Sequence, residues 1–161
     1  MLAAGPEECS AETNMNSDVE LPKLMVIDDD AGISEIIETL GRETGYDVTV
    51  VNDYELIRQQ YRKVQPDYIT LDLDLGVDEE LEIAERGFDG LEFLQFLASQ
   101  DCQAKIIIVS GSSKETRQVT AKIGKELNLD IIGSIGKPFK VSEFEKLLQK
   151  LRDRSLGGKS Q

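Results

Sequence analysis

The sequence predicts an α/β fold in which five strands of a mainly parallel sheet alternate with five helices. Short apolar runs of strand length alternate with longer stretches whose apolar residues recur at helical spacing, and this alternation is typical of β-α-β units. The first run is apolar without interruption, as expected of a strand buried on both faces of the sheet. Several runs end in polar residues. Because the carboxyl ends of parallel strands lie at one rim of the sheet, we expect these residues to gather there.

The first unit comprises a strand over Leu24 to Ile27 and a helix that ends near Gly45. The strand is followed by three consecutive acids: Asp28, Asp29 and Asp30. Apolar residues then recur at the i, i+3, i+4 and i+7 positions of one helix face: Ile33, Ile36, Ile37 and Leu40. Asp30 is a typical N-cap and Gly45 a typical C-terminal signal, so both ends of this helix are predicted.

The second unit comprises a strand from Tyr46 to Val51 and a helix that Asp53 is placed to cap. This helix carries three apolar residues: Leu56, Ile57 and Tyr61. Pro66 indicates a turn before the third strand, which spans Tyr68 to Leu71 and ends at Asp72.

The remaining strands also end in polar residues. Asp89 opens a helix with three apolar residues inward: Leu91, Leu94 and Leu97. The fourth strand, Lys105 to Val109, ends at Ser110, and the fifth, Asp130 to Ile135, precedes Lys137.

Capping boxes, in which a serine precedes a glutamate by three residues, mark the last two helices. Ser112 with Glu115 predicts a helix from 113 to about 128, and Ser142 with Glu145 predicts the final helix.

The folded domain is predicted to span residues 22–153. Residues 1–20 contain five acids and no base. They can bury too little apolar area to offset the entropy of ordering, so we expect a disordered acidic tail over 1–21. Residues 154–161 are expected to form a flexible tail.

The overall composition excludes several classes of partner. A net charge of -13 opposes nonspecific binding to nucleic acid, whose phosphates attract basic surfaces. The acids are concentrated in residues 1–104, with 25 acids and 6 bases, whereas 105–161 hold 6 acids and 12 bases. The chain lacks a long apolar run and a signal peptide, so we expect a cytoplasmic protein without a membrane partner. Cys9 and Cys102 lack the spacing of a disulfide framework or zinc site and are predicted to be free thiols.

The strand ends carry three acids, a hydroxyl and an ammonium group: Asp28, Asp29, Asp72, Ser110 and Lys137. Crowded carboxylates repel one another, and Mg²⁺ relieves this repulsion while leaving coordination positions for a phosphate. A carboxylate can also attack phosphorus while a metal ion and an ammonium group neutralise the phosphoryl oxygens. The set therefore indicates phosphoryl transfer to an aspartate, with Mg²⁺ as the cofactor.

Five segments resemble the successive motifs of the response-regulator receiver family of two-component signalling: 24–30, 66–72, 89–92, 109–111 and 137–139. The resemblance covers about residues 22–153. It implies a doubly wound, five-stranded parallel sheet with the flavodoxin-like strand order 2-1-3-4-5. It also implies a signalling switch, not an enzyme, whose only reactions are phosphorylation from a donor or an acyl phosphate and its own dephosphorylation. The implied donor is a histidine kinase or histidine phosphotransfer protein, and the signal passes to a downstream protein or a fused output domain.

The resemblance also assigns roles to single residues. Asp72 is the phosphoacceptor, Ser110 the switch hydroxyl, and Lys137 the ion-pair partner of the phosphoryl oxygens. Gly111 leaves room beside the phosphate. The implied magnesium ligands are Asp28, Asp29, Asp72 and, through its backbone carbonyl, Asp74.

Two features depart from the family pattern. An aromatic residue is common three positions before the lysine, where this chain has Ser134, so we expect Ser110 and the loop that follows it to carry most of the activation. The second feature is an insertion from Gly76 to Gly87, with five acids and one base. It is expected to be either a solvated loop or a gate or docking element beside the acceptor.

Two alternative functions remain open. Asp72 to Val77 resembles the nucleophile motif of haloacid-dehalogenase phosphatases, although two β-α units precede it here and that motif follows the first strand in those enzymes. The other alternative is a receiver-fold domain with a degenerate, unphosphorylated site. The chain could stand alone or be a fragment of a larger regulator.

Overall fold

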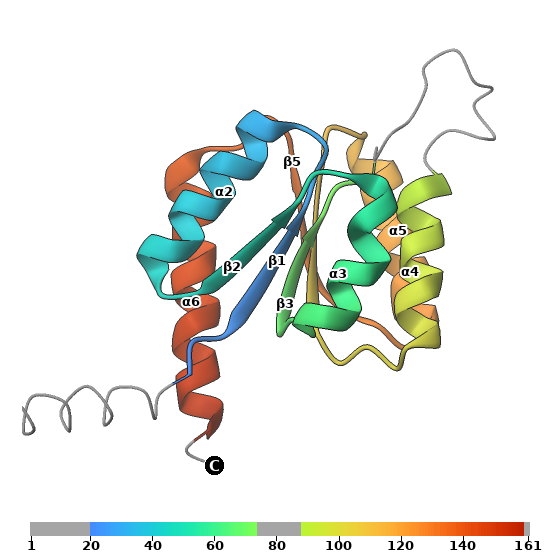
Figure 1. Ribbon diagram of the computed structural model, residues 1–161. Helices are drawn as coiled ribbons and strands as arrows, with labels where there is room; N and C mark the ends of the chain where they lie inside the picture. The colour runs from blue at the N-terminus through green and yellow to red at the C-terminus, as the bar shows by residue number, and fades with distance from the viewer. Residues whose placement is uncertain (1–19, 74–87, 160–161) are drawn as a thin grey trace, which may run out of the picture.

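The computed structural model describes residues 20–73 and 88–159. It contains five strands: β1 (Lys23–Ile27), β2 (Asp47–Val51), β3 (Tyr68–Leu71), β4 (Lys105–Ser110) and β5 (Asp130–Gly136). They form one parallel sheet in the order β2-β1-β3-β4-β5 (Figure 1). The α/β fold class and the strand order implied by the family resemblance are confirmed.

Helices cover both faces of this sheet. They are α2 (Ala31–Thr44), α3 (Ile57–Val64), α4 (Phe88–Ser99), α5 (Lys114–Glu126) and α6 (Val141–Lys159), with a 3₁₀ helix, η1 (Tyr54–Leu56), before α3. Figure 1 shows α2 and α6 on one face and α3, α4 and α5 on the other. The carboxyl ends of all five strands therefore lie at one rim, between the two layers of helices.

Each face of the sheet has its own hydrophobic core, and β1 contributes to both. Met25 and Ile27 belong to the core under α3, α4 and α5, whereas Leu24 and Val26 belong to the core under α2 and α6. All four side chains are at most 1% exposed. Successive strand residues point to opposite faces, so a strand between two helical layers must be apolar at every position.

Both predicted ends of α2 are confirmed. The Asp30 carboxylate accepts hydrogen bonds from the backbone N–H groups of Gly32 at 2.9 Å and Ile33 at 3.1 Å. Gly45 has a φ of 100° at the C-cap, a left-handed conformation that glycine adopts without a steric penalty.

The caps predicted for α5 and α6 are wrong by a few residues. Ser113, not Ser112, caps α5, because its Oγ accepts a hydrogen bond from the N–H of Thr116 at 3.1 Å. Helix α6 begins at Val141, so Ser142 lies inside its first turn. The serine-glutamate spacing selects Ser112, because only Ser112 has a glutamate three residues later, but the Ser112 hydroxyl and N–H bond to Ser110 and the next serine caps the helix.

The helix predicted after Asp53 is also corrected. The Asp53 carboxylate accepts a hydrogen bond from the N–H of Glu55 at 2.9 Å, but this contact opens the 3₁₀ helix η1. Helix α3 begins at Ile57 without a side-chain cap. Leu56, predicted to belong to this helix, is 43% exposed because it lies in the short 3₁₀ turn, before the helical period begins.

Several predictions fall at or beyond the edge of the described residues. Residues 1–19, Asp74 and the insertion Gly76–Gly87 lie outside them, so the disorder of 1–21 and the role of the insertion stay predictions.

Helix α6 continues to Lys159, past the predicted boundary at 153. Residues 154–159 contain two glycines but no proline, and glycine weakens a helix without blocking it. The flexibility of 154–161 stays a prediction. Within the part of the chain that the structure describes, no helix has the length and apolar character of a membrane span.

Two buried tyrosines donate hydrogen bonds to α6, and the contribution of the first to stability can be tested by substitution. The Tyr46 hydroxyl, on a side chain 2% exposed, donates to the carbonyl of Leu148 at 2.6 Å. Burial raises the pKa of this phenol well above its usual range. The Tyr68 hydroxyl makes a longer bond of 3.2 Å to the carbonyl of Leu151.

We expect Tyr46→Phe to lower the free energy of unfolding by about 1 kcal/mol, measured by urea denaturation, because it removes one buried hydrogen bond. Tyr68→Phe should cost less, and an unchanged midpoint for Tyr46→Phe would contradict the assignment.

Candidate functional site

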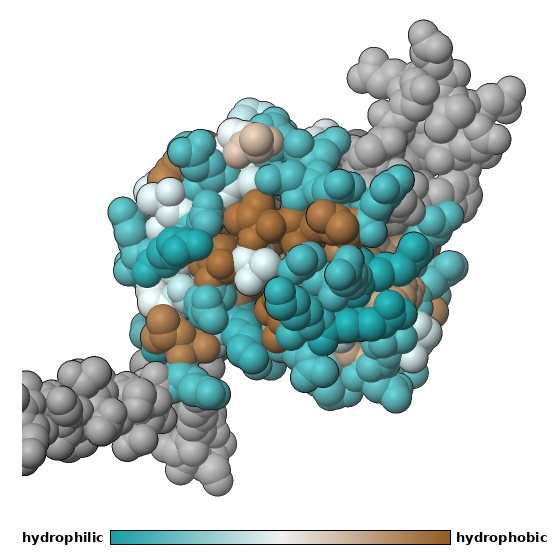
Figure 2. All heavy atoms as spheres, in the orientation of Figure 1, coloured by the Kyte–Doolittle hydropathy of each residue, from teal (hydrophilic) through white to brown (hydrophobic). Residues whose placement is uncertain are grey.

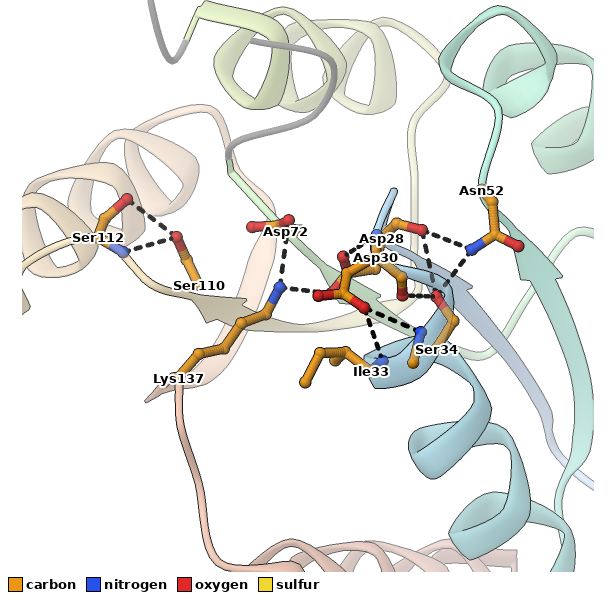
Figure 3. Close-up of polar contacts among 10 residues, drawn as sticks. Asp28, Asp30, Ile33, Ser34, Asn52, Asp72, Ser110, Ser112 and Lys137 are labelled. Carbon is orange, nitrogen blue, oxygen red and sulfur yellow. Dashed lines mark hydrogen bonds and ion pairs between the residues drawn. The ribbon is translucent and has the colours of Figure 1, made fainter. Parts of the chain in front are cut away.

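The structure brings the predicted strand-end residues together at the carboxyl rim of the sheet (Figure 3). Asp28 follows β1, Asp72 follows β3, Ser110 is the last residue of β4, and Lys137 follows β5. The side chains of Asp28, Asp72 and Ser110 are 2%, 4% and 0% exposed. Two carboxylates and a hydroxyl are thus buried at one place, where each needs an ion-pair or hydrogen-bond partner.

Lys137 lies between two of the carboxylates. Its Nζ is 2.6 Å from Oδ2 of Asp28 and 3.2 Å from Oδ2 of Asp72, and its side chain is 16% exposed. Burial by itself would lower the pKa of this ammonium group. The hydrogen bond and charge of Asp28, together with the charge of Asp72, outweigh burial and raise the pKa of Lys137 above its usual value. Lys137 is therefore held in its charged form.

Three carboxylates form a group that suits a hard metal ion. One oxygen each from Asp28, Asp29 and Asp72 lies within 4.8 Å of the others. Oδ2 of Asp28 is buried and faces a cation, since the ammonium of Lys137 lies 2.6 Å away. An all-oxygen donor set with excess negative charge fits Mg²⁺. Asp74, whose carbonyl was predicted to complete the set, lies outside the described residues.

Hydrogen bonds hold the backbone of Asp28 in place, and the residues that donate them, Asn52 and Ser34, were not among the predicted site residues. The Asn52 side chain donates to the carbonyl of Asp28 at 2.7 Å and to the Ser34 hydroxyl at 2.8 Å. The Ser34 hydroxyl donates to the carbonyls of Asp28 and Asp30 at 3.2 and 3.0 Å. Asn52 directly follows β2, so the strand-end rule that selected the other site residues would also have selected it.

The Ser110 hydroxyl is directed toward the loop that follows β4 (Figure 3). It donates to the Ser112 hydroxyl at 2.9 Å and accepts from the N–H of Ser112 at 3.1 Å. The carbonyl of Ser110 accepts from the N–H of Lys137 at 2.9 Å, which fastens the end of β4 to the end of β5. A Cβ built on Gly111 would meet no atom within 4 Å, so there is open space at this residue.

The chemistry of the site follows from these contacts. A carboxylate attacks phosphorus only if the negative charges of the two groups are offset, and a buried ammonium ion beside it supplies part of that charge. Asp72 alone lies at the end of the central strand with both an acidic pair and Lys137 beside it. Ser134, at the position where an aromatic residue was noted as common, is exposed on β5.

Comparisons with known proteins agree with this geometry. The family model of the response regulator receiver domain matches residues 24–149. The DNA-binding response regulator MtrA of Mycobacterium tuberculosis is 28% identical over 122 residues, which cover 76% of this chain and 46% of MtrA. The regulatory protein VirG of Agrobacterium tumefaciens is 29% identical over 144 residues, covering 86% of this chain and 48% of VirG. The chain spans about half the length of these curated relatives.

Solved structures are similar over the whole domain. A response regulator from Colwellia psychrerythraea superposes with a TM-score of 0.68 at 20% identity, over 84% of this chain and 99% of that chain. The receiver domain of the Francisella response regulator 1452 has a TM-score of 0.60 at 27% identity, over 83% of this chain and 98% of that chain.

Proposed function

Because the chain belongs to the response regulator receiver domain family, we propose that Asp72 accepts a phosphoryl group from a histidine kinase or a histidine phosphotransfer protein. The observation that carries this proposal is the position of Asp72. It is 4% exposed at the end of the central strand and 3.2 Å from the ammonium of Lys137. The other buried carboxylate, Asp28, has its backbone carbonyl fixed by Asn52 and pairs with Lys137 at 2.6 Å. Its place beside the lysine suits a supporting role.

In the proposed step, a carboxylate oxygen of Asp72 forms a bond to phosphorus. The bond between phosphorus and the donor nitrogen breaks, and its electron pair leaves with the histidine ring. Lys137 stays protonated and neutralises the phosphoryl oxygens, which carry more charge than the carboxylate they replace. Ser110 donates a hydrogen bond to one of these oxygens once its hydroxyl has left Ser112.

Asp28, Asp29 and Asp72 would hold Mg²⁺, with a further ligand expected from the carbonyl of Asp74. Bound there, the ion would neutralise charge on the carboxylates and on the incoming phosphoryl group. The three carboxylate oxygens within 4.8 Å of one another support this assignment.

The reaction is proposed to be stoichiometric, as in a signalling switch. The haloacid-dehalogenase alternative is not favoured, because Asp72 follows β3, the third strand along the chain, whereas that motif follows the first strand in those enzymes. A degenerate site is not favoured either, because the acidic pair, the acceptor, the hydroxyl and the lysine all lie at the same rim of the sheet. We propose that the signal passes to a downstream protein or to an output domain in the same chain, through the surface of α5, β5 and α6.

The function is tested by measuring the intact mass of the protein after incubation with acetyl phosphate and Mg²⁺. We expect one phosphoryl group per chain, and we expect no adduct when EDTA removes the metal. The same Mg²⁺ concentration should raise the melting temperature, because the ion binds only the folded carboxylate site. A protein that stays unmodified with acetyl phosphate and with a phosphohistidine donor is not a phosphoacceptor. Repeated hydrolysis of an aryl phosphate would instead identify a phosphatase.

A further inference from the structure

We propose that Arg117 is a positioning residue that holds the loop between β4 and α5, residues 111–113, in the conformation that keeps the Ser110 hydroxyl on Ser112. In this role Arg117 stabilises the unphosphorylated conformation and disfavours the change to the phosphorylated one. The inference rests on the proposed function of Asp72.

The guanidinium group of Arg117 connects three parts of the structure. Arg117 lies in the first part of α5, and its Nη1 donates a hydrogen bond to the carbonyl of Ser112. The same group packs against Gly136, the last residue of β5. A Cβ built on Gly136 would lie 2.9 Å from Nη1 and 3.0 Å from Cζ of Arg117. Arg117 therefore occupies the space that any side chain at position 136 would need.

This contact acts on the switch hydroxyl through Ser112. Two hydrogen bonds join Ser110 and Ser112: the Ser110 hydroxyl donates to the Ser112 hydroxyl, and it accepts from the Ser112 N–H. The Ser110 hydroxyl has one proton, so it can donate to a phosphoryl group on Asp72 only by giving up the bond that it donates to the Ser112 hydroxyl. Arg117 holds Ser112 by its carbonyl, which keeps the Ser112 hydroxyl and N–H beside Ser110 and thereby favours the present bonds.

The hydrogen bond from Arg117 to Ser112 is partly offset within the same side chain. Nε of Arg117 is buried without a hydrogen-bond partner among the described residues, and an unsatisfied buried donor is unfavourable. The unfavourable burial of Nε thus offsets part of the stabilisation that the hydrogen bond to Ser112 provides. A contact with this balance suits a reversible restraint.

The restraint is tested by titrating the metal-loaded protein with beryllofluoride, an anion that mimics a phosphoryl group on aspartate, and by following backbone amide shifts. Arg117→Ala should bind beryllofluoride about tenfold more tightly than the parent, because a larger fraction of the protein already has a free loop. Loss of a positive charge near an anion site would by itself weaken binding, so tighter binding cannot come from electrostatics. Arg117→Lys, which keeps the charge and one donor, should bind nearly as the parent does.

Gly136→Ala tests the same contact without removing the arginine, since the new methyl group would displace the guanidinium. It should tighten binding in the same direction, and the double variant Arg117→Ala with Gly136→Ala should add little further. The exposed Lys122 on the same helix gives a control, because Lys122→Ala should bind as the parent does.

The outcomes separate the restraint from a merely structural role and from the proposed function. A structural role predicts a lower melting temperature with unchanged or weaker binding in Arg117→Ala, and that result overturns the restraint. Unchanged binding in Gly136→Ala overturns it as well. If the parent itself fails to bind beryllofluoride, the proposed function of Asp72 fails, and the restraint fails with it.

Discussion

Asp72→Asn is expected to abolish the phosphoryl adduct. The amide has almost the shape of the carboxylate but lacks the negative oxygen that attacks phosphorus, so the nucleophile is lost while the packing at β3 is retained. The variant also removes one of the three carboxylates that would hold Mg²⁺. The measurement is intact mass after incubation with acetyl phosphate and Mg²⁺, followed by peptide mapping of the parent to locate the modified residue.

A matched control lies at the other end of the same strand. Asp67 precedes β3 at its amino end, and its carboxylate accepts a hydrogen bond from the N–H of Lys23 at 2.8 Å. Asparagine can accept the same bond, so Asp67→Asn should be labelled as the parent is. If Asp72→Asn were labelled as strongly as the parent, the phosphoacceptor would have to be another carboxylate, with Asp28 and Asp29 as the candidates.

Lys137→Met is expected to have the second large effect, and it acts on stability as well as on labelling. Methionine has a similar length but no charge, so the variant leaves Asp28 and Asp72, 2% and 4% exposed, without their ammonium partner. Removing one member of a buried ion pair costs about 3–5 kcal/mol, because the remaining charge is uncompensated. The free energy of unfolding of the metal-free protein, measured with urea, should fall by about this amount. The raised pKa of Lys137 agrees in direction with a charged form stabilised in the folded protein.

Mg²⁺ should offset part of this loss, since a divalent ion on the same carboxylates replaces the missing positive charge. The rate of labelling should still fall about 100-fold, because the charge that neutralises the phosphoryl oxygens is gone. The exposed Lys140, three residues along the chain, supplies the control, and Lys140→Met should change neither quantity. Equal stability of Lys137→Met and the parent without Mg²⁺ would contradict the proposed ion-pair role.

The positions of whole strands and helices could be predicted from the local sequence pattern. The apolar run of Leu24 to Ile27 predicted a doubly buried strand, and the structure places it second from the edge, between two helical layers. Asp30 and Gly45 predicted both ends of α2, because a cap is an interaction within a few residues of the chain. The capping box failed at α5 because the local spacing selects Ser112, whose hydroxyl and N–H instead bond to Ser110, so that Ser113 caps the helix.

By itself, the sequence determined the fold class and the residues that gather at the rim. The end of each strand can be recognised from a few neighbouring residues. The parallel arrangement then brings four strand-end residues to the same edge for any loop conformation: Asp28, Asp72, Ser110 and Lys137. Only the tertiary structure decided which side chains touch. The ion pairs of Lys137, the support of Asp28 by Asn52, and the contact of Arg117 with Ser112 and Gly136 join residues from separate elements. Such contacts depend on how helices pack across the sheet to within an ångström, and no periodicity along one chain segment carries that information.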